Sequence, residues 1–182
     1  MNSIFLILGQ RLGRAIATMP DLDHRNMLLM GLIYIFLTLL LGLTTGFLRW
    51  NPIASGRVIF RVVTTSFFAP AIIEELCFRV LPVPYPATED LSRSYLLWSG
   101  FSLLLFVIYH PLNALTFFPQ GKETFFDPIF LSLAGILGLT CAIAYQQTGS
   151  LWLPVAIHWL AVVFWLLCFD GLHRLKMDSS SG

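Results

Sequence analysis

The sequence predicts an all-α protein, a polytopic transmembrane helix bundle of about five membrane spans plus a short N-terminal interfacial helix. Of its 182 residues, 57% are hydrophobic and only 12% are charged, whereas soluble domains average about 25% charged residues. The mean hydropathy is +0.77, and five long apolar segments are separated by polar or proline-containing stretches. These observations indicate a single integral membrane domain over residues 1–182.

The charge balance limits the partners. The formal net charge is +1 at pH 7, which provides no basic surface for a nucleic acid. We therefore expect membrane lipid as the surroundings and no nucleic-acid partner. The expected localisation is a multi-pass protein of the plasma membrane or another bacterial-type inner membrane.

The N-terminal segment Met1–Met19 is predicted to be the interfacial helix. Its apolar patch, Ile4–Leu8, is short and has no preceding charge, while Arg11 and Arg14 follow it. A secretory signal peptide has the opposite order, with its basic residues first. We therefore expect a helix that lies at the membrane surface or inserts only in part.

The first two spans are predicted at Met27–Leu48 and at about Val58–Val80. A bilayer core of about 30 Å requires roughly 20 apolar residues in a helix, and Met27–Leu48 provides them without a charge. Trp50 and Pro52 then end that span with an interfacial aromatic residue and a helix stop. Prolines make the segment after the second span, LPVPYPATED, an extended loop.

Three further spans are predicted at Tyr95–Phe118, Ile129–Tyr145 and Leu151–Phe169, the first of them interrupted at Pro111. The segment FPQGKETFFDP is expected to be a loop between the third and fourth spans. A very short turn at residues 146–149 predicts that the fourth and fifth spans are antiparallel neighbours. The final segment, GLHRLKMDSSSG, is expected to be a polar tail without order.

A small set of ionisable side chains lies within these spans. Its members are Arg61, Glu74, Glu75, Arg79, His110 and His158. Arg61 is near a helix end, where its long side chain can reach the interface. A charge in the middle of a bilayer costs about 2.5–3.5 kcal/mol on insertion scales, so such residues usually pair, face a cavity and mark function. The other five are therefore candidate site residues.

Helical geometry separates the two adjacent glutamates. Glu75 and Arg79 are four positions apart with the acid first, the favourable order for an ion pair along a helix. That pair alone is equally well explained as a structural ion pair. Glu74 is rotated by about 100° from Glu75 and lacks this partner, which makes it a candidate general base.

The two histidines lie on different predicted spans. A single membrane histidine is more often a hydrogen-bonded packing residue than a functional one. His110 and His158 occur together with the unpaired Glu74, and side chains from three helices can meet at one point in a bundle. We therefore expect these three side chains to share a polar cavity.

These residues resemble the CPBP family, which comprises CAAX prenyl endopeptidases and bacteriocin-processing or immunity proteins, also called Abi. The matching elements occur in the family's order: EExxxR at Glu74, Glu75 and Arg79, FxxxH at Phe106 and His110, and a histidine, His158, within GSLWLPVAIHW. The resemblance covers about residues 60–167, which would form the catalytic core.

The resemblance implies an intramembrane endopeptidase of the glutamate type, acting on a membrane-associated or prenylated protein or peptide. In this reading Glu74 activates a water jointly with His110. Glu75 and Arg79 organise the site, and His158 helps to bind the water or the tetrahedral intermediate. The expected partner is a peptide or protein substrate, with or without a lipid group.

Zinc is an alternative to a site without a cofactor. A catalytic zinc site uses three protein ligands and an open position, and Glu74, His110 and His158 would satisfy that number. The chain has no HExxH motif, and no two of these three residues lie four positions apart on one helix. We therefore favour a site without metal.

One position departs from the family pattern. The third motif usually reads HxxxN or HxxxD, but this chain has Val162 four residues after His158. The alternative function is therefore a catalytically weak or inactive scaffold or immunity protein of the same fold. Asn113, on the same helix as His110, is a candidate to supply the hydrogen-bond donor that Val162 lacks. Unless it or a backbone amide fills that role, Val162→Asn is expected to raise turnover.

Overall fold

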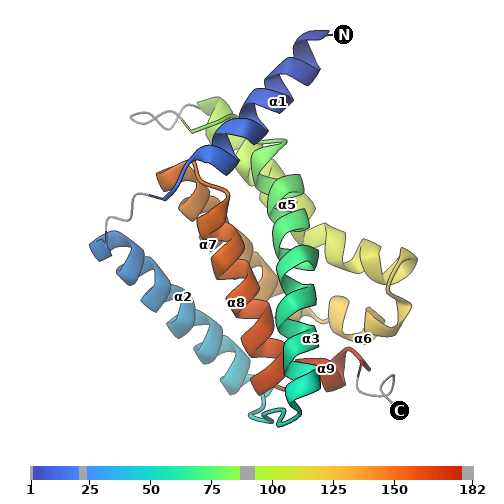
Figure 1. The fold of residues 1–182 in the computed structure, drawn as a ribbon. Coiled ribbons are helices and arrows are strands. Elements are labelled where there is room, and N and C mark those ends of the chain that lie inside the picture. The colour runs from blue at the N-terminus through green and yellow to red at the C-terminus, as the bar shows by residue number, and fades with distance from the viewer. Residues whose placement is uncertain (1, 21–23, 87–92, 178–182) are drawn as a thin grey trace.

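The computed structural model describes residues 2–20, 24–86 and 93–177. Helices account for nearly all of the regular structure (Figure 1). No β-strand occurs within these three ranges, where the only extended pairing is an isolated bridge between Asn51 and Phe169. The predicted all-α membrane bundle is confirmed.

Four of the described helical segments are long and apolar enough to cross a membrane. They are Asn26–Thr44 within α2 (His24–Thr44), Gly56–Val80, α5 (Arg93–Thr116) and α7 (Pro128–Thr148). A fifth apolar helix, α8 (Trp152–Cys168), has 17 residues and is shorter than these four. The protein is an integral membrane protein.

The second span is divided just before the glutamates. It consists of α3 (Gly56–Ser66), η1 (Phe67–Ile72), α4 (Ile73–Glu75) and η2 (Leu76–Val80). Pro70 disfavours a helical conformation at the residue before it, and Ala69 accordingly has φ −137° and ψ 115°. The chain therefore bends within η1, and the segment that carries the glutamates follows the bend.

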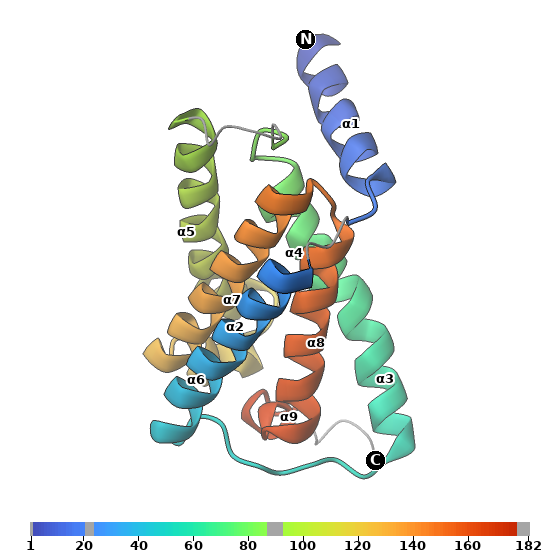
Figure 2. The ribbon, with the colours of Figure 1, turned by 90° about the vertical axis from the view of Figure 1, so that its left-hand side faces the viewer.

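Helix α7 is the centre of the bundle. It packs against α2, α5 and α8, and α8 packs in turn against α3 and η1 (Figure 2). The predicted neighbours α7 and α8 thus lie side by side. At Gly138 a side chain would lie 2.8 Å from Phe106 Cδ1, so this glycine allows α5 and α7 to approach closely.

The predicted N-terminal helix is α1 (Asn2–Ala17), which leaves the bundle at the end opposite α9 (Figures 1 and 2). Arg11 Nη1 donates a hydrogen bond to the Leu81 carbonyl at 2.9 Å, and Trp152 Nε1 donates to the Ile16 carbonyl at 2.9 Å. These bonds attach the helix to the bundle. Its interfacial position remains a prediction.

The expectation of a tail without order was wrong for residues 171–177. Helix α9 (Gly171–Arg174) forms there, and Leu172 and Leu175 are 1% and 6% exposed. Two leucines three positions apart lie on one face of a helical turn, and here that face packs into the hydrophobic core. The remainder of the predicted tail, residues 178–182, lies outside the described residues.

Two other local expectations are corrected. Helix α5 continues through Pro111. A proline removes only one backbone hydrogen bond, and the packing of α5 against α7 holds the two halves of the helix together. The expected loop FPQGKETFFDP contains η3 (Pro119–Gly121) and α6 (Lys122–Phe125). The proline-rich loop is non-helical up to Pro86, and its end, residues 87–90, lies outside the described part of the chain.

Candidate active site

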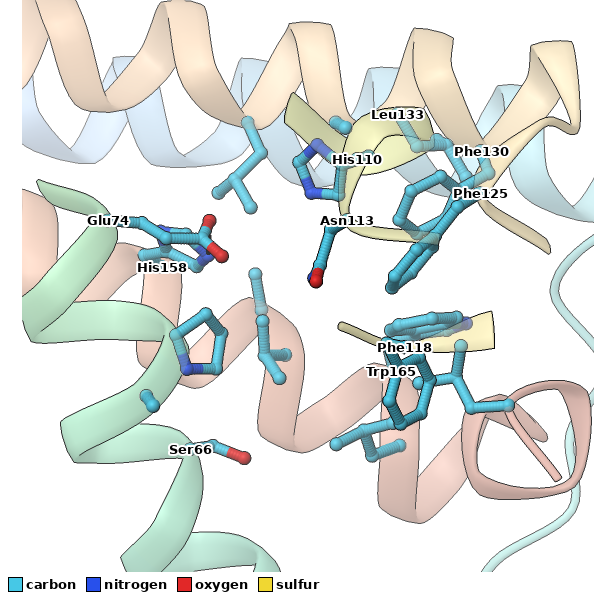
Figure 3. Close-up of a pocket in the computed structure, with 18 of the residues that line it drawn as sticks. Ser66, Glu74, His110, Asn113, Phe118, Phe125, Phe130, Leu133, His158 and Trp165 are labelled. Carbon is cyan, nitrogen blue, oxygen red and sulfur yellow. Dashed lines mark ion pairs between the residues drawn. The ribbon is translucent and has the colours of Figure 1, made fainter. Parts of the chain in front are cut away.

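A cavity of about 700 Å³ lies inside the bundle, and Glu74, His110 and His158 all line it. Figure 3 shows Glu74 and His158 together on one side and His110 across the cavity from them. Away from these residues the wall is mostly apolar and rich in aromatic side chains, which include Phe118, Phe125, Phe130 and Trp165. Three segments far apart in the sequence therefore contribute polar groups to one end of a largely apolar cavity.

Glu75 is fully enclosed and engaged by two partners. Its Oε2 lies 3.4 Å from Arg79 Nε, and its Oε1 accepts a hydrogen bond from His158 Nδ1 at 2.7 Å. Both Glu75, at 0% exposure, and Arg79, at 1%, are buried. The i, i+4 ion pair predicted from the sequence is present, but its histidine partner was not foreseen.

Arg79 joins this ion pair to two neighbouring helices. Its Nη2 donates to the Gly138 carbonyl of α7 at 3.1 Å, and its guanidinium lies 4.7 Å from the ring centroid of Phe106 on α5. A buried charge is tolerated when its partners satisfy it. The Glu75–Arg79 pair therefore belongs to the packing between α5, α7 and α8.

Glu74 has a different environment. It is 8% exposed, and its Oε2 lies 3.8 Å from His158 Nε2, beyond hydrogen-bond distance. This oxygen has no hydrogen-bond partner among the described residues. Glu74 is thus close to His158 without being saturated by it, and its carboxylate borders the cavity.

The hydrogen bonds of the two histidines determine which ring nitrogen carries the proton. A backbone carbonyl only accepts, so His110 Nδ1, 3.0 Å from the Phe106 carbonyl, is the protonated nitrogen. His158 Nδ1 likewise donates to the Glu75 carboxylate. In a neutral imidazole the other nitrogen is then a hydrogen-bond acceptor, and in His158 this Nε2 is the nitrogen beside Glu74.

Phe106 connects these groups. It is 1% exposed, and its ring lies edge-to-face against His110 and His158, at centroid distances of 5.1 and 5.8 Å. Sequence reasoning gave Phe106 only a place in a motif and did not detect Gly138. An apolar residue within an apolar run carries no signal of the side chain that it will contact.

The described residues contain no group of three His, Cys, Asp or Glu side chains that could hold a metal ion. The zinc alternative required Glu74, His110 and His158 as a ligand set, and this arrangement does not provide one. We therefore derive no step through a metal, and the cofactor-free site remains a prediction.

Comparison with known families identifies the chain. The model of the Rce1-like family, described as type II CAAX prenyl endopeptidase, matches residues 55–164, more than half of the sequence. The chain belongs to this family. The predicted resemblance is confirmed, and the family is one of proteases. Neither a search of curated proteins nor one of solved structures found a match.

In this Rce1-like protein the atypical Val162 also lines the cavity. It is one helical turn beyond His158 on α8 and offers no hydrogen-bonding group. Asn113 on α5 lines the same cavity, and Figure 3 shows its carboxamide on the side of the cavity that carries His110. The catalytic roles assigned to Glu74, His110, His158, Glu75 and Arg79 remain predictions.

Proposed function

We propose that the protein is an intramembrane endopeptidase in which Glu74 activates a water for attack on a peptide bond. One observation carries this proposal. Of two adjacent buried glutamates, Glu75 has one oxygen hydrogen-bonded to His158 Nδ1 and the other in an ion pair with Arg79, whereas Glu74 Oε2 lies 3.8 Å from His158 Nε2 without a hydrogen bond and its residue borders the cavity. A carboxylate that is close to a cavity and not saturated is able to accept a proton from a bound water.

The proposed reaction transfers one proton twice. The water oxygen attacks the carbonyl carbon while Glu74 takes a proton from it, and the carbonyl oxygen becomes an oxyanion. Glu74 then passes that proton to the amide nitrogen as the C–N bond breaks, which yields a carboxylic acid and an amine. The acceptor nitrogen of His110 takes the second hydrogen of the water and orients it, and Glu75 and Arg79 hold His158 in place beside Glu74.

The shape and lining of the cavity support a lipidated substrate. Its aromatic part extends from the polar residues toward α9, where Leu175 also contributes to the wall. In a CAAX sequence the cysteine carries a prenyl group and three residues follow it. We propose that the apolar part accommodates the prenyl chain while the peptide bond lies beside Glu74.

The test uses a farnesylated CAAX peptide and the full-length protein in detergent or vesicles. Glu74→Gln keeps the size of the side chain but removes the base, so kcat should fall by about 10²–10⁴-fold. His110→Ala should also lower kcat. The matched control is Glu123→Gln, because Glu123 is an exposed glutamate on α6 paired only with the exposed Lys176. Glu74→Gln retaining more than a tenth of the parent kcat would refute the role of Glu74.

A second candidate function is a membrane scaffold of the same fold without turnover. Val162 favours it, since this position supplies no donor to the cavity. A parent protein that binds the farnesylated peptide but cleaves no member of a peptide panel would support the scaffold.

A further inference from the structure

At the polar end of the cavity, Glu74, His110 and His158 present hydrogen-bond acceptors. An ionised Glu74 only accepts, and both histidines have already used their Nδ1 protons on Glu75 and on the Phe106 carbonyl. These groups can hold a water through its two hydrogens. With neutral imidazoles, however, they have no hydrogen to offer to an oxyanion.

Hydrolysis of an amide nevertheless requires donors where the negative charge develops. Val162 has none, and the Arg79 guanidinium is enclosed between Glu75 and the Gly138 carbonyl. The Thr65 hydroxyl donates to the Arg61 carbonyl. The Trp165 side chain lies in the aromatic part of the cavity, away from Glu74 (Figure 3).

Asn113 meets this need. It follows His110 by three positions on α5, which places both side chains on one helix face, and its residue lines the cavity. Its backbone carbonyl accepts from Phe117 N and Phe118 N at 2.9 Å each and so completes the helix end. The described residues provide no hydrogen-bond partner for its carboxamide, whose NH₂ group carries two donors.

We infer that the Asn113 carboxamide donates a hydrogen bond to the oxyanion formed during peptide hydrolysis, in place of a group that Val162 cannot provide. This inference rests on the proposed function. The attacking water is then bound on the side of the cavity that carries Glu74 and His158. The oxyanion is bound from the facing side, which carries Asn113 (Figure 3).

The decisive variant is Asn113→Leu, which keeps a similar shape and removes both donors. Loss of one oxyanion donor costs about 10²–10³-fold in kcat, so we expect that loss with KM changed by less than about threefold. Tyr109→Phe is the matched control, because Tyr109 precedes His110, lines the same cavity and carries a different donor. It should retain parent activity.

A second variant moves the donor to another helix. Val162 borders the same cavity from α8, so adding Val162→Asn to Asn113→Leu should restore kcat by at least about tenfold, within the range of one oxyanion donor. The inference fails if Asn113→Leu stays within about threefold of the parent kcat while Glu74→Gln is inactive, since the peptidase would then operate without Asn113.

Binding of a transition-state analogue separates the inference from the proposed function. The probes are a phosphinate analogue of the farnesylated peptide, whose anionic oxygen mimics the oxyanion, and the same peptide with an N-methylated, uncleavable scissile amide. Asn113→Leu should weaken phosphinate binding by about 10–100-fold and leave the amide peptide within about threefold. Equal losses for both probes would show a structural role and overturn the inference, whether or not the parent cleaves peptides. If Asn113→Leu does not fold, Asn113→Ala replaces it.

Discussion

Glu74 and Glu75 are adjacent in the sequence but belong to two different regions of the molecule. Glu75 is 0% exposed and bound by Arg79 and His158 on the enclosed side. Glu74 is 8% exposed, borders the cavity and leaves Oε2 without a hydrogen bond. A rotation of about 100° along one helix is enough to place the two carboxylates in different surroundings, one enclosed beside Arg79 and one at the cavity.

The difference has a simple physical origin. The face of the span that carries Glu75 and Arg79 meets α7, where Gly138 leaves its carbonyl accessible to Arg79. The neighbouring face meets the cavity instead, and there Glu74 Oε2 lies 3.8 Å from His158 Nε2. The enclosed side should therefore govern stability, and the cavity side should govern turnover.

The largest expected effect compares the same substitution at the two positions. Glu75→Gln leaves Arg79 buried without a compensating charge, which costs about 3–5 kcal/mol in the free energy of unfolding. Glu74→Gln should cost less than about 1 kcal/mol, because Glu74 has no tight ion pair to lose. Equilibrium unfolding in mild detergent measures both. Equal losses for the two variants would mean that the whole cluster is structural.

His158 joins the two regions, and two substitutions divide its roles. Asparagine places its amide near the position of Nδ1 and can keep the bond to Glu75, whereas glutamine places its amide near Nε2 and loses that bond. We expect His158→Gln to be less stable than His158→Asn by about 1–3 kcal/mol, the cost of an unsatisfied buried charged group.

Both His158 variants should turn over substrate more slowly than the parent, since neither retains the imidazole beside Glu74. Unfolding in detergent and kcat on the farnesylated peptide are the two measurements. If His158→Asn were the less stable variant, the bond between Nδ1 and Glu75 would not be the one that matters for stability.

The smallest expected effect concerns Val162→Asn alone. If Asn113 already supplies the oxyanion donor, a second amide at position 162 should change kcat by less than about threefold. This is far below the loss in kcat of about 10²–10³-fold that a missing oxyanion donor causes. The comparison of kcat on one peptide is sufficient. A tenfold increase would instead show that the native cavity lacks a donor and that Asn113 does not act as one.

Much of the fold follows from local patterns. Uncharged segments of about 20 residues predict spans, and the helices at Asn26–Thr44 and Pro128–Thr148 agree with them. Errors arose where a local rule met tertiary packing. Pro111 was expected to interrupt a helix that is continuous, and residues 171–177 were expected to lack order although Leu172 packs into the core.

The sequence by itself determined the pairs that lie within one helix turn. The i, i+4 spacing of Glu75 and Arg79 brings them together in any helix, and the rotation of Glu74 away from them follows from the same geometry. The order of the glutamates and histidines also sufficed to indicate the family that the match over residues 55–164 establishes.

Only the tertiary structure decided how the helices complete the site. His158 bonds to Glu75 across 83 positions, and Arg79 bonds to the Gly138 carbonyl across 59. Such contacts depend on the rotation and distance of whole helices, which result from the packing of many side chains at once. No spacing in the sequence encodes them, so the bond of Glu75 to His158 and the 3.8 Å separation of Glu74 Oε2 from His158 Nε2 became visible only in three dimensions.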